Sequence, residues 1–207
     1  MKTTIIPANH PDAIALACEA VRSGGLIAFP TDTLYGLGCD PNLSKALLKI
    51  YAAKGRDASK AIPVLLSRPE QLRSLIERIP ESACRLMDAF WPGALTLVLP
   101  KHPNLPPELT PYPGLAVRMP KHPIALALLD QTGPLAVTSA NISDHENPTD
   151  AQGVLAQLDS RINLLLDGGK LSSGKASTII DCLGAEPKLL RAGPIPFNTI
   201  LERWNNQ

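Results

Sequence analysis

The segment F-P-T-D-T-L-Y-G-L-G runs from Phe29 to Gly38, at the end of an apolar stretch. Residues 26–29 are apolar throughout, which predicts a buried strand. The strand is followed by Thr31, Asp32 and Thr33, three consecutive side chains that form hydrogen bonds. A turn needs some polar residues, but three such groups at the end of an apolar strand predict more than a turn. The segment therefore predicts a strand that delivers polar groups to a binding site.

Patterns typical of helices and strands alternate along the rest of the chain. Helices are expected over residues 11–21, 44–53, 69–76, 80–90, 123–131 and 197–204, and a capping box of Thr149 and Gln152 predicts the start of another. Strands are expected over residues 26–29, 62–66, 94–99, 115–119, 135–138, 162–166, 178–182 and 188–190. Both helix-containing and short connections occur, so parallel and antiparallel pairs are expected. The prediction is a single α/β domain over residues 1–207, with a twisted mixed sheet and helices on its faces.

The composition excludes several classes of protein. The net charge is +1 and aromatic residues make up 4% of the chain, which disfavours a strongly basic nucleic-acid binder and an aromatic stacking platform for single strands. The six prolines within residues 100–114 predict an ordered or semi-rigid surface loop. Cys18, Cys39, Cys84 and Cys182 are scattered, as are the histidines. Buried free thiols and no metal site are therefore expected.

The sequence contains no apolar run near the ~20 residues that a membrane span needs, and its N-terminus lacks the pattern of a secretory leader. A cytoplasmic protein without a membrane partner is expected.

Residues 169–176, G-K-L-S-S-G-K-A, nearly match a phosphate loop. Alanine replaces the hydroxyl residue that would bind magnesium, and a strand pattern follows where the mechanism needs a helix. A P-loop NTPase is therefore rejected, although the glycines, the lysines and Ser177 leave open an anion-binding loop or a plain surface loop.

Three other features are ambiguous one by one. The cations Lys54, Arg56 and Lys60 surround a glycine, which suits either a polyphosphate site or a helix C-terminus. Arg118 lies within an apolar strand and needs a partner, either a structural carboxylate or a bound anion. The strand that ends V-T-S-A-N, residues 137–141, carries polar groups that are also ordinary in turns. Ligands of open α/β sheets bind at strand ends, so these features together predict one site there.

The motifs P-T-D-T-L-Y-G-L-G, K-G-R, L-A-V-R-M-P, S-A-N-I-S, S-T-I-I-D and L-L-R-A-G occur in this order. In content and order they resemble the YrdC-like family of threonylcarbamoyl-AMP synthases, over about residues 10–195. The resemblance implies a twisted α/β sheet around a cationic cleft, in the short form of the family. It also implies synthesis of threonylcarbamoyl-AMP from L-threonine, bicarbonate and ATP, with release of pyrophosphate. Mg²⁺ is expected with the ATP, and no tightly bound cofactor.

The product would supply a threonylcarbamoyl transferase complex that modifies tRNA to N6-threonylcarbamoyladenosine, and tRNA itself is a candidate partner. The alternative is a YrdC-like protein that binds double-stranded RNA, tRNA or a nucleotide without synthase activity. A carbamoyl-transfer relative, like the corresponding domain of hydrogenase maturation proteins, is a further alternative. Incubation with ATP while threonine or bicarbonate is omitted would separate these functions.

Site residues follow from the resemblance by motif. Lys54 and Arg56 would be catalytic. The threonine site would comprise Thr31, Thr33, Tyr35, Arg118, Val137 and Thr138, and the ATP site would comprise Lys54, Arg56, Lys60, Ser139, Asn141, Asn147, Ser177 and Arg191. Gly36 and Gly38 would let backbone approach the ligand. The chain departs from the family pattern at Lys60, Leu65, Asn147 and Asp144. Asp144 replaces a common glycine, which predicts a loop of different shape.

Overall fold

A computed structural model describes residues 2–172 and 174–205. Within them, ten strands form one sheet in the order β1-β8-β2-β3-β7-β4-β6-β5-β9-β10. The strands are β1 (Thr4–Pro7), β2 (Ile27–Pro30), β3 (Tyr35–Cys39), β4 (Val64–Leu65), β5 (Leu95–Pro100), β6 (Gly114–Arg118), β7 (Leu135–Ser139), β8 (Leu164–Asp167), β9 (Thr178–Asp181) and β10 (Lys188–Arg191). The sheet contains both parallel pairs, such as β4 with β6, and antiparallel pairs, such as β3 with β7. The predicted mixed sheet is confirmed.

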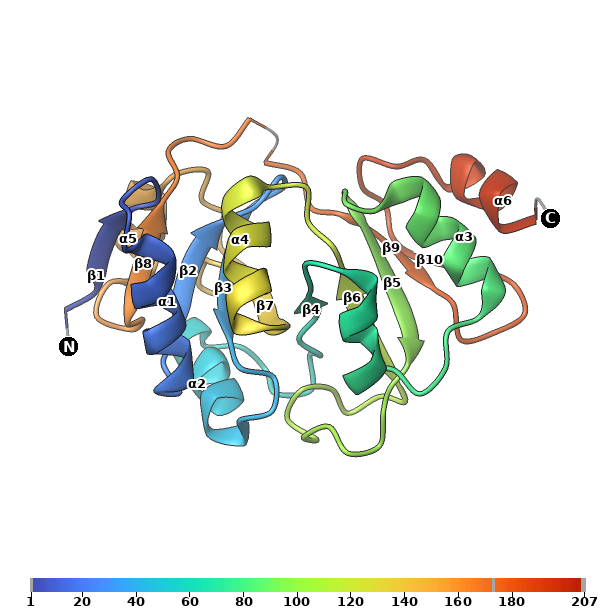
Figure 1. Cartoon of the computed structure of the whole chain (residues 1–207), viewed down its shortest axis with the longest axis horizontal. Helices are drawn as coiled ribbons and strands as arrows, with labels where there is room; N and C mark the ends of the chain where they lie inside the picture. The colour runs from blue at the N-terminus through green and yellow to red at the C-terminus, as the bar shows by residue number, and fades with distance from the viewer. Residues whose placement is uncertain (1, 173, 206–207) are drawn as a thin grey trace.

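Helices cover both faces of the sheet. They are α1 (Ala13–Arg22), α2 (Ser44–Lys54), α3 (Glu81–Phe90), α4 (Pro123–Thr132), α5 (Ala151–Leu158) and α6 (Phe197–Asn205), with a 3₁₀ helix, η1 (Pro69–Ser74). Helices α1 and α4 pack together on one face of β2, against Ile27 and Phe29. Helices α2 and α5 belong to the core on the opposite face, with Ala28. At the other end of the sheet α3 packs against α6 (Figure 1).

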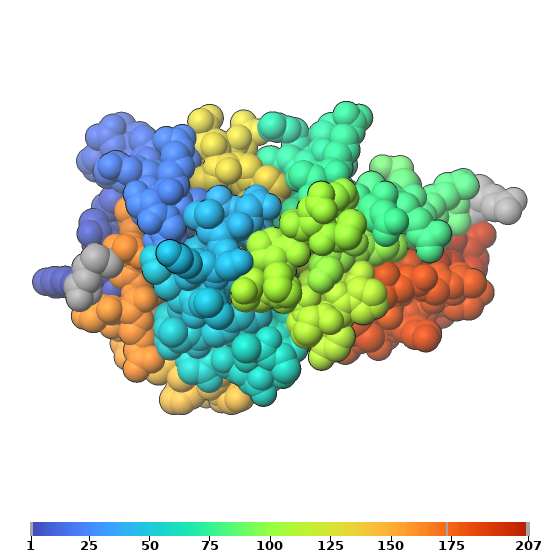
Figure 2. All heavy atoms as spheres, turned by 90° about the horizontal axis from the view of Figure 1, so that it is seen from below, coloured from blue at the N-terminus to red at the C-terminus, as the bar shows by residue number. Residues whose placement is uncertain are grey.

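The loop between β5 and β6 is ordered, as its prolines predict. The hydroxyl groups of Tyr51 and Ser44, both on α2, donate hydrogen bonds to the backbone and the carboxylate of Glu108 in this loop. In Figure 2 the yellow-green loop lies against the cyan surface of α2. The loop therefore has a fixed position at the ends of β5 and β6, and its residues Tyr112 and Pro113 reach the cleft described below.

Several element boundaries differ from the sequence prediction. Strand β4 has two residues rather than the predicted five, and residues 69–74 form a 3₁₀ helix rather than an α-helix. Strands β1 and β3 were not predicted. Helix α5 is capped by Asp150, whose carboxylate accepts a hydrogen bond from Gly153 N at 2.8 Å, and not by Thr149. Asp at the N-cap satisfies a free backbone N–H just as the proposed capping box would have.

Strand β3 was not predicted because it contains two glycines. Gly36 and Gly38 favoured a loop, but both lie in the strand and face its neighbours. A Cβ on Gly36 would lie 2.7 Å from Cγ1 of Val137, and a Cβ on Gly38 would lie 3.2 Å from both Phe29 and Val137. The close packing of β2, β3 and β7 therefore requires glycine here, without any need to invoke a ligand. The same register places Ser139 beside Gly36 and so brings the end of β7 to the Thr31–Thr33 turn.

Within the described residues, no helix is both long enough and apolar enough to cross a membrane. Cys18, Cys39 and Cys182 are buried free thiols, as predicted, whereas Cys84 is half-buried on α3.

Candidate active site

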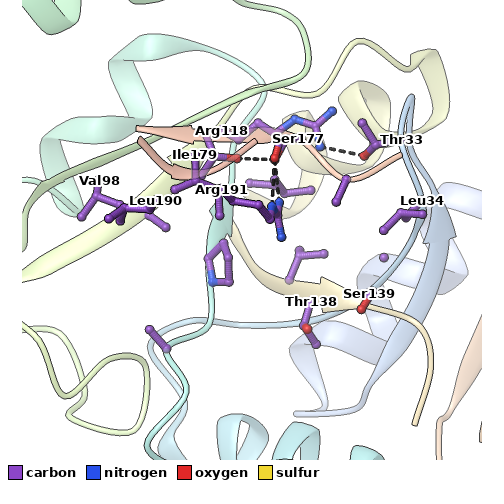
Figure 3. A pocket seen from close by; sticks show the side chains of 18 of the residues that line it. Thr33, Leu34, Val98, Arg118, Thr138, Ser139, Ser177, Ile179, Leu190 and Arg191 are labelled. Atoms are coloured by element: carbon purple, nitrogen blue, oxygen red, sulfur yellow. Dashed lines mark hydrogen bonds between the residues drawn. The ribbon is translucent and has the colours of Figure 1, made fainter. Parts of the chain in front are cut away.

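A cleft of about 680 Å³ opens where the ends of β3, β6 and β7 meet β9 and β10. Eleven of the sequence-predicted site residues line it: Thr31, Thr33, Tyr35, Arg56, Arg118, Val137, Thr138, Ser139, Asn147, Ser177 and Arg191. Figure 3 shows Arg118, Arg191, Ser177 and Thr33 gathered in this hollow, with Thr138 and Ser139 below them. Lys54, Lys60 and Asn141 do not line the cleft. The fold therefore brings most of the dispersed motifs to one place.

Thr31 and Thr33 have different tasks in the turn after β2. The Thr31 hydroxyl donates to Leu34 O at 2.6 Å and accepts from the backbone N–H groups of Thr33 and Leu34. These bonds close the turn, so Thr31 shapes the site from within. The Thr33 hydroxyl lies 2.8 Å from Nη1 of Arg118 and lines the cleft. Of the two threonines, it is therefore Thr33 whose hydroxyl accepts a hydrogen bond from the guanidinium of Arg118.

Arg118 has a structural carboxylate partner, one of the two alternatives that the sequence left open. Its Nη2 donates to Asp32 Oδ1 at 2.6 Å and its Nε donates to Gly93 O at 2.8 Å. The residue is 5% exposed, yet it lines the cleft. Burial lowers the pKa of Arg118, and the charge of Asp32 opposes this shift. Each terminal nitrogen carries two hydrogens, so both nitrogens keep one hydrogen for a ligand.

Arg191 is held at the cleft by Ser177. Its Nε donates to Ser177 O at 3.0 Å and its Nη2 donates to Ser177 Oγ at 3.1 Å. The same hydroxyl is 2.7 Å from Thr96 Oγ1 on β5. Partial burial lowers the pKa of Arg191. The motifs S-T-I-I-D and L-L-R-A-G therefore meet across β9 and β10, and they present one fixed guanidinium to the cleft.

Arg56 supplies a third guanidinium. It follows α2, whose C-terminus is closed by Gly55 in the left-handed conformation, with φ 58°. Its Nη2 donates to Ala61 O at 2.8 Å, while its Nε is buried without a hydrogen-bond partner. Burial lowers its pKa. The helix-capping interpretation of this segment is correct for Gly55, and the cation after it nevertheless lines the cleft.

Lys54 ends α2 and points away from the cleft into the loop after β7. Its side chain is 1% exposed, and its Nζ donates to Ser139 O, Asn141 O and Asn141 Oδ1 at 2.5, 2.5 and 3.0 Å. Burial and the neighbouring charge of Arg56 lower the pKa of Lys54 to about 7, against the opposing effect of Asp144. The lysine therefore holds the loop that carries Ser139.

This pKa shift predicts a pH dependence of stability. Between pH 7 and 10.5, the two pKa values of Lys54, the folded chain binds fewer protons at this side chain than the unfolded chain does. The contribution of Lys54 to the free energy of unfolding therefore rises with pH, by about 1 kcal/mol from pH 7.5 to pH 8.5. Urea titrations at both pH values should show this rise in the native chain and not in the Lys54→Met variant. An equal rise of the free energy of unfolding with pH in the two proteins would contradict the lowered pKa of Lys54.

The loop after β7 has a glycine-type conformation at Asp144, one of the four positions at which the sequence departs from the family pattern. Asp144 has a φ of 65°, in the left-handed region that glycine adopts without strain. Its carboxylate is 3.5 Å from Lys60 Nζ, but both side chains are exposed, and such pairs contribute little. Lys60 therefore lies outside the cleft, where its ammonium group faces the Asp144 carboxylate.

Asp144→Gly is expected to raise the free energy of unfolding by about 0.5–1 kcal/mol, because it removes left-handed strain and only an exposed ion pair. Denaturant unfolding measures this. Asp144→Ala, which keeps the strain, should not stabilise the chain, and a gain as large as that of the glycine variant would argue against strain as the cause.

Tyr35 lines the cleft together with Ala176 and Ser177. The Tyr35 hydroxyl donates to Gly169 O at 2.7 Å and accepts from Gly168 N at 3.1 Å. Burial raises its pKa to about 12, so the phenol stays protonated at neutral pH. Strand β9, not a helix, follows this loop, which confirms that no P-loop forms here; Ser173 of the motif lies outside the described residues.

The apolar part of the cleft was missed from the sequence. Val98, Ala116 and Ile179 line it from β5, β6 and β9. Their chain neighbours Leu97, Leu115 and Ile180 are fully buried on the opposite face. Because strand side chains alternate between faces, this alternation was the available signal. Within the described residues, no group of three or more His, Cys, Asp or Glu side chains is placed to hold a metal ion.

Comparison with known proteins identifies the family. Residues 19–193 match the Sua5/YciO/YrdC family, which carries the description telomere recombination. The chain belongs to this family. It is 40% identical over 197 residues to a putative threonylcarbamoyl-AMP synthase of Mycobacterium tuberculosis, covering 95% of this chain and 91% of that protein. It is 43% identical over 196 residues to the threonylcarbamoyl-AMP synthase of Bacillus subtilis, covering 93% of this chain and 56% of that protein.

Solved structures of the family agree in fold. The Sua5 protein of Pyrococcus abyssi, solved in complex with L-threonine, superposes with a TM-score of 0.92 at 39% identity, covering 98% of this chain and 61% of that one. YciO of E. coli superposes with a TM-score of 0.85 at 27% identity, covering 96% of this chain and 98% of that one. The chain therefore spans about nine tenths of the mycobacterial relative, and about 60% of the Bacillus and Pyrococcus proteins.

Proposed function

We propose that this chain synthesises threonylcarbamoyl-AMP from L-threonine, bicarbonate and ATP, and releases pyrophosphate. The observation that supports this most directly is the convergence of Arg56, Arg118 and Arg191 on one cleft that also contains the Thr33 hydroxyl. Relatives that match nearly the whole chain carry the name threonylcarbamoyl-AMP synthase, and the Sua5 relative binds L-threonine.

Threonine would bind at the Thr33–Arg118 end. The two free hydrogens on the Arg118 terminal nitrogens suit a carboxylate, which accepts such bonds in pairs. A hydroxyl-reading pocket would discriminate strongly against analogues that lack the hydroxyl. It would reject serine, which lacks only a methyl group, by about 1–3 kcal/mol.

The triphosphate of ATP, with its Mg²⁺ as part of the substrate, would bind toward Arg56, Ser139, Ser177 and Arg191. The neutral amine of threonine would attack bicarbonate with loss of water, or CO₂ with release of the amine proton to solvent, and either route gives a carbamate. A carbamate oxygen then attacks the α-phosphorus of ATP as pyrophosphate leaves. Two anions ~4 Å apart repel by ~4 kcal/mol at an effective dielectric near 20. The guanidinium groups offset this repulsion and align the two anions, which is the main catalytic task here.

The decisive experiment measures pyrophosphate release from ATP with threonine or bicarbonate omitted in turn. Release that needs both substrates supports the synthase. Release that is indifferent to both would point to a different reaction of ATP. Nucleotide binding without release would favour the alternative of a nucleotide-binding or RNA-binding protein. Liquid chromatography of the adenylate product tests its chemical identity. In the cell this product would pass to a threonylcarbamoyl transferase complex that acts on tRNA.

A further inference from the structure

The hydrogen bonds of Lys54 leave it no donor for a substrate. All the lysines of the chain lie in its described part, and Lys54 is the buried one. The ammonium form of Lys54 has three N–H donors, and the neutral amine that forms above its pKa of about 7 has two. Three acceptors within 3.0 Å, two carbonyl oxygens and the Asn141 side chain, take them all. A phosphate could bond to Lys54 only by displacing one of these bonds in a buried place.

Ser139 is the link between Lys54 and the cleft. The Ser139 side chain lines the cleft and donates to Asn141 Oδ1 at 2.6 Å, the same oxygen that Lys54 bonds. The Asn141 amide nitrogen is fixed in turn by His145 O at 2.7 Å. An amide oxygen accepts two hydrogen bonds. If the Ser139 hydroxyl turns to a ligand oxygen, the bond from Lys54 still satisfies Asn141 Oδ1, and no buried acceptor is left unpaired.

We propose that Lys54 is a positioning residue, which acts on the substrate through Asn141 and Ser139 and makes no contact with it. Its three hydrogen bonds fix the loop after β7 and keep the Ser139 hydroxyl free to turn to a phosphate oxygen. Only the identity of the ligand as a phosphate rests on the proposed function. Arg56, two residues further along the chain, is by contrast a residue of the cleft wall.

A double-substitution cycle tests this route. The variants are Lys54→Met, Ser139→Ala and the two combined, with kcat and KM for ATP measured per folded molecule well below the melting temperature. Lys54→Met alone should lower kcat about tenfold. In the Ser139→Ala background it should lower kcat less than twofold, because its route is already broken. A second tenfold loss in that background would mean that Lys54 binds the substrate itself, and the proposal would be wrong.

A matched control is Lys45→Met, which removes an exposed lysine from the same helix and should leave kcat unchanged. A merely structural role of Lys54 would lower the melting temperature and the folded fraction but leave kcat per folded molecule at the native value. That result would also overturn the proposal.

A second measurement needs no variant. In protein labelled with both ¹⁵N-lysine and ¹⁵N-arginine at pH 6, the buried Lys54 ammonium should give a signal protected from exchange. Addition of Mg-ATP, or of tripolyphosphate as a probe without a base, should leave the signal protected, while the Nε signals of Arg56 and Arg191 shift. Loss of the protection on binding would contradict the proposal. If no pyrophosphate is released under any condition, the proposed function fails, yet tripolyphosphate still tests Lys54.

Discussion

Arg118→Met is expected to raise the KM for L-threonine at least ~100-fold. The substitution removes two charge-assisted hydrogen bonds that the guanidinium would offer to the substrate carboxylate, each worth about 1.5–3 kcal/mol. It also removes the charged partner of the Thr33 hydroxyl, at 2.8 Å, and leaves that hydroxyl with the Thr31 hydroxyl at 3.1 Å. Pyrophosphate release at increasing threonine concentrations measures the effect, with ATP saturating. A KM within threefold of the native value would remove Arg118 from the threonine site.

Asp32 supplies the control for this experiment. Loss of Arg118 leaves the largely buried Asp32 carboxylate without its ion-pair partner, which should lower the free energy of unfolding by about 3 kcal/mol. Adding Asp32→Asn removes that unpaired charge. The double variant should therefore regain part of the stability and none of the affinity for threonine. Recovery of both would show that the loss came from misfolding and not from the missing guanidinium.

The fold could be predicted where hydrophobic pattern and chain direction agree. Residues 94–99 and 115–119 are apolar, with turn residues between them, and they became the antiparallel pair β5 and β6. The failures lie where tertiary packing overrides local preference. Strand β3 contains two glycines, which are poor strand formers on their own. They are required only because Phe29 and Val137 occupy the space that a side chain would need.

The candidate site could be predicted as a set of residues but not as a set of contacts. The motifs identified Arg118 and Thr33, and the structure joins them directly. Nothing in the spacing of the sequence says that Asp32 turns toward Arg118, or that Lys54 turns away from the cleft toward Asn141. Two residues that lie two positions apart at the end of a helix can point in opposite directions. Lys54 and Arg56 therefore belong to one sequence motif, but only Arg56 lines the cleft. Such orientation depends on the neighbouring strands, which the sequence does not place.

Arg56→Ala is expected to lower kcat/KM for ATP by about 10- to 100-fold with the fold intact. Arg56 bonds to the chain through Nη2 only, and its Nε is buried without an acceptor. The Arg56→Ala variant therefore loses a single hydrogen bond to a carbonyl oxygen, and it also loses a buried donor that had no acceptor. Its melting temperature should be close to that of the native chain. The cleft loses one of its three guanidinium groups, and with it part of the charge that offsets the repulsion between carbamate and triphosphate.

Two companion variants make the result specific to Arg56. Arg203→Ala removes an exposed arginine from the last turn of α6 and should leave kcat/KM unchanged. Arg56→Lys keeps the charge but not the planar pair of donors, so it should recover only part of the activity if phosphate is bound through two nitrogens. Full recovery by lysine would mean that charge alone matters at this position. Near-native kinetics for Arg56→Ala would contradict a role of this guanidinium in binding the triphosphate.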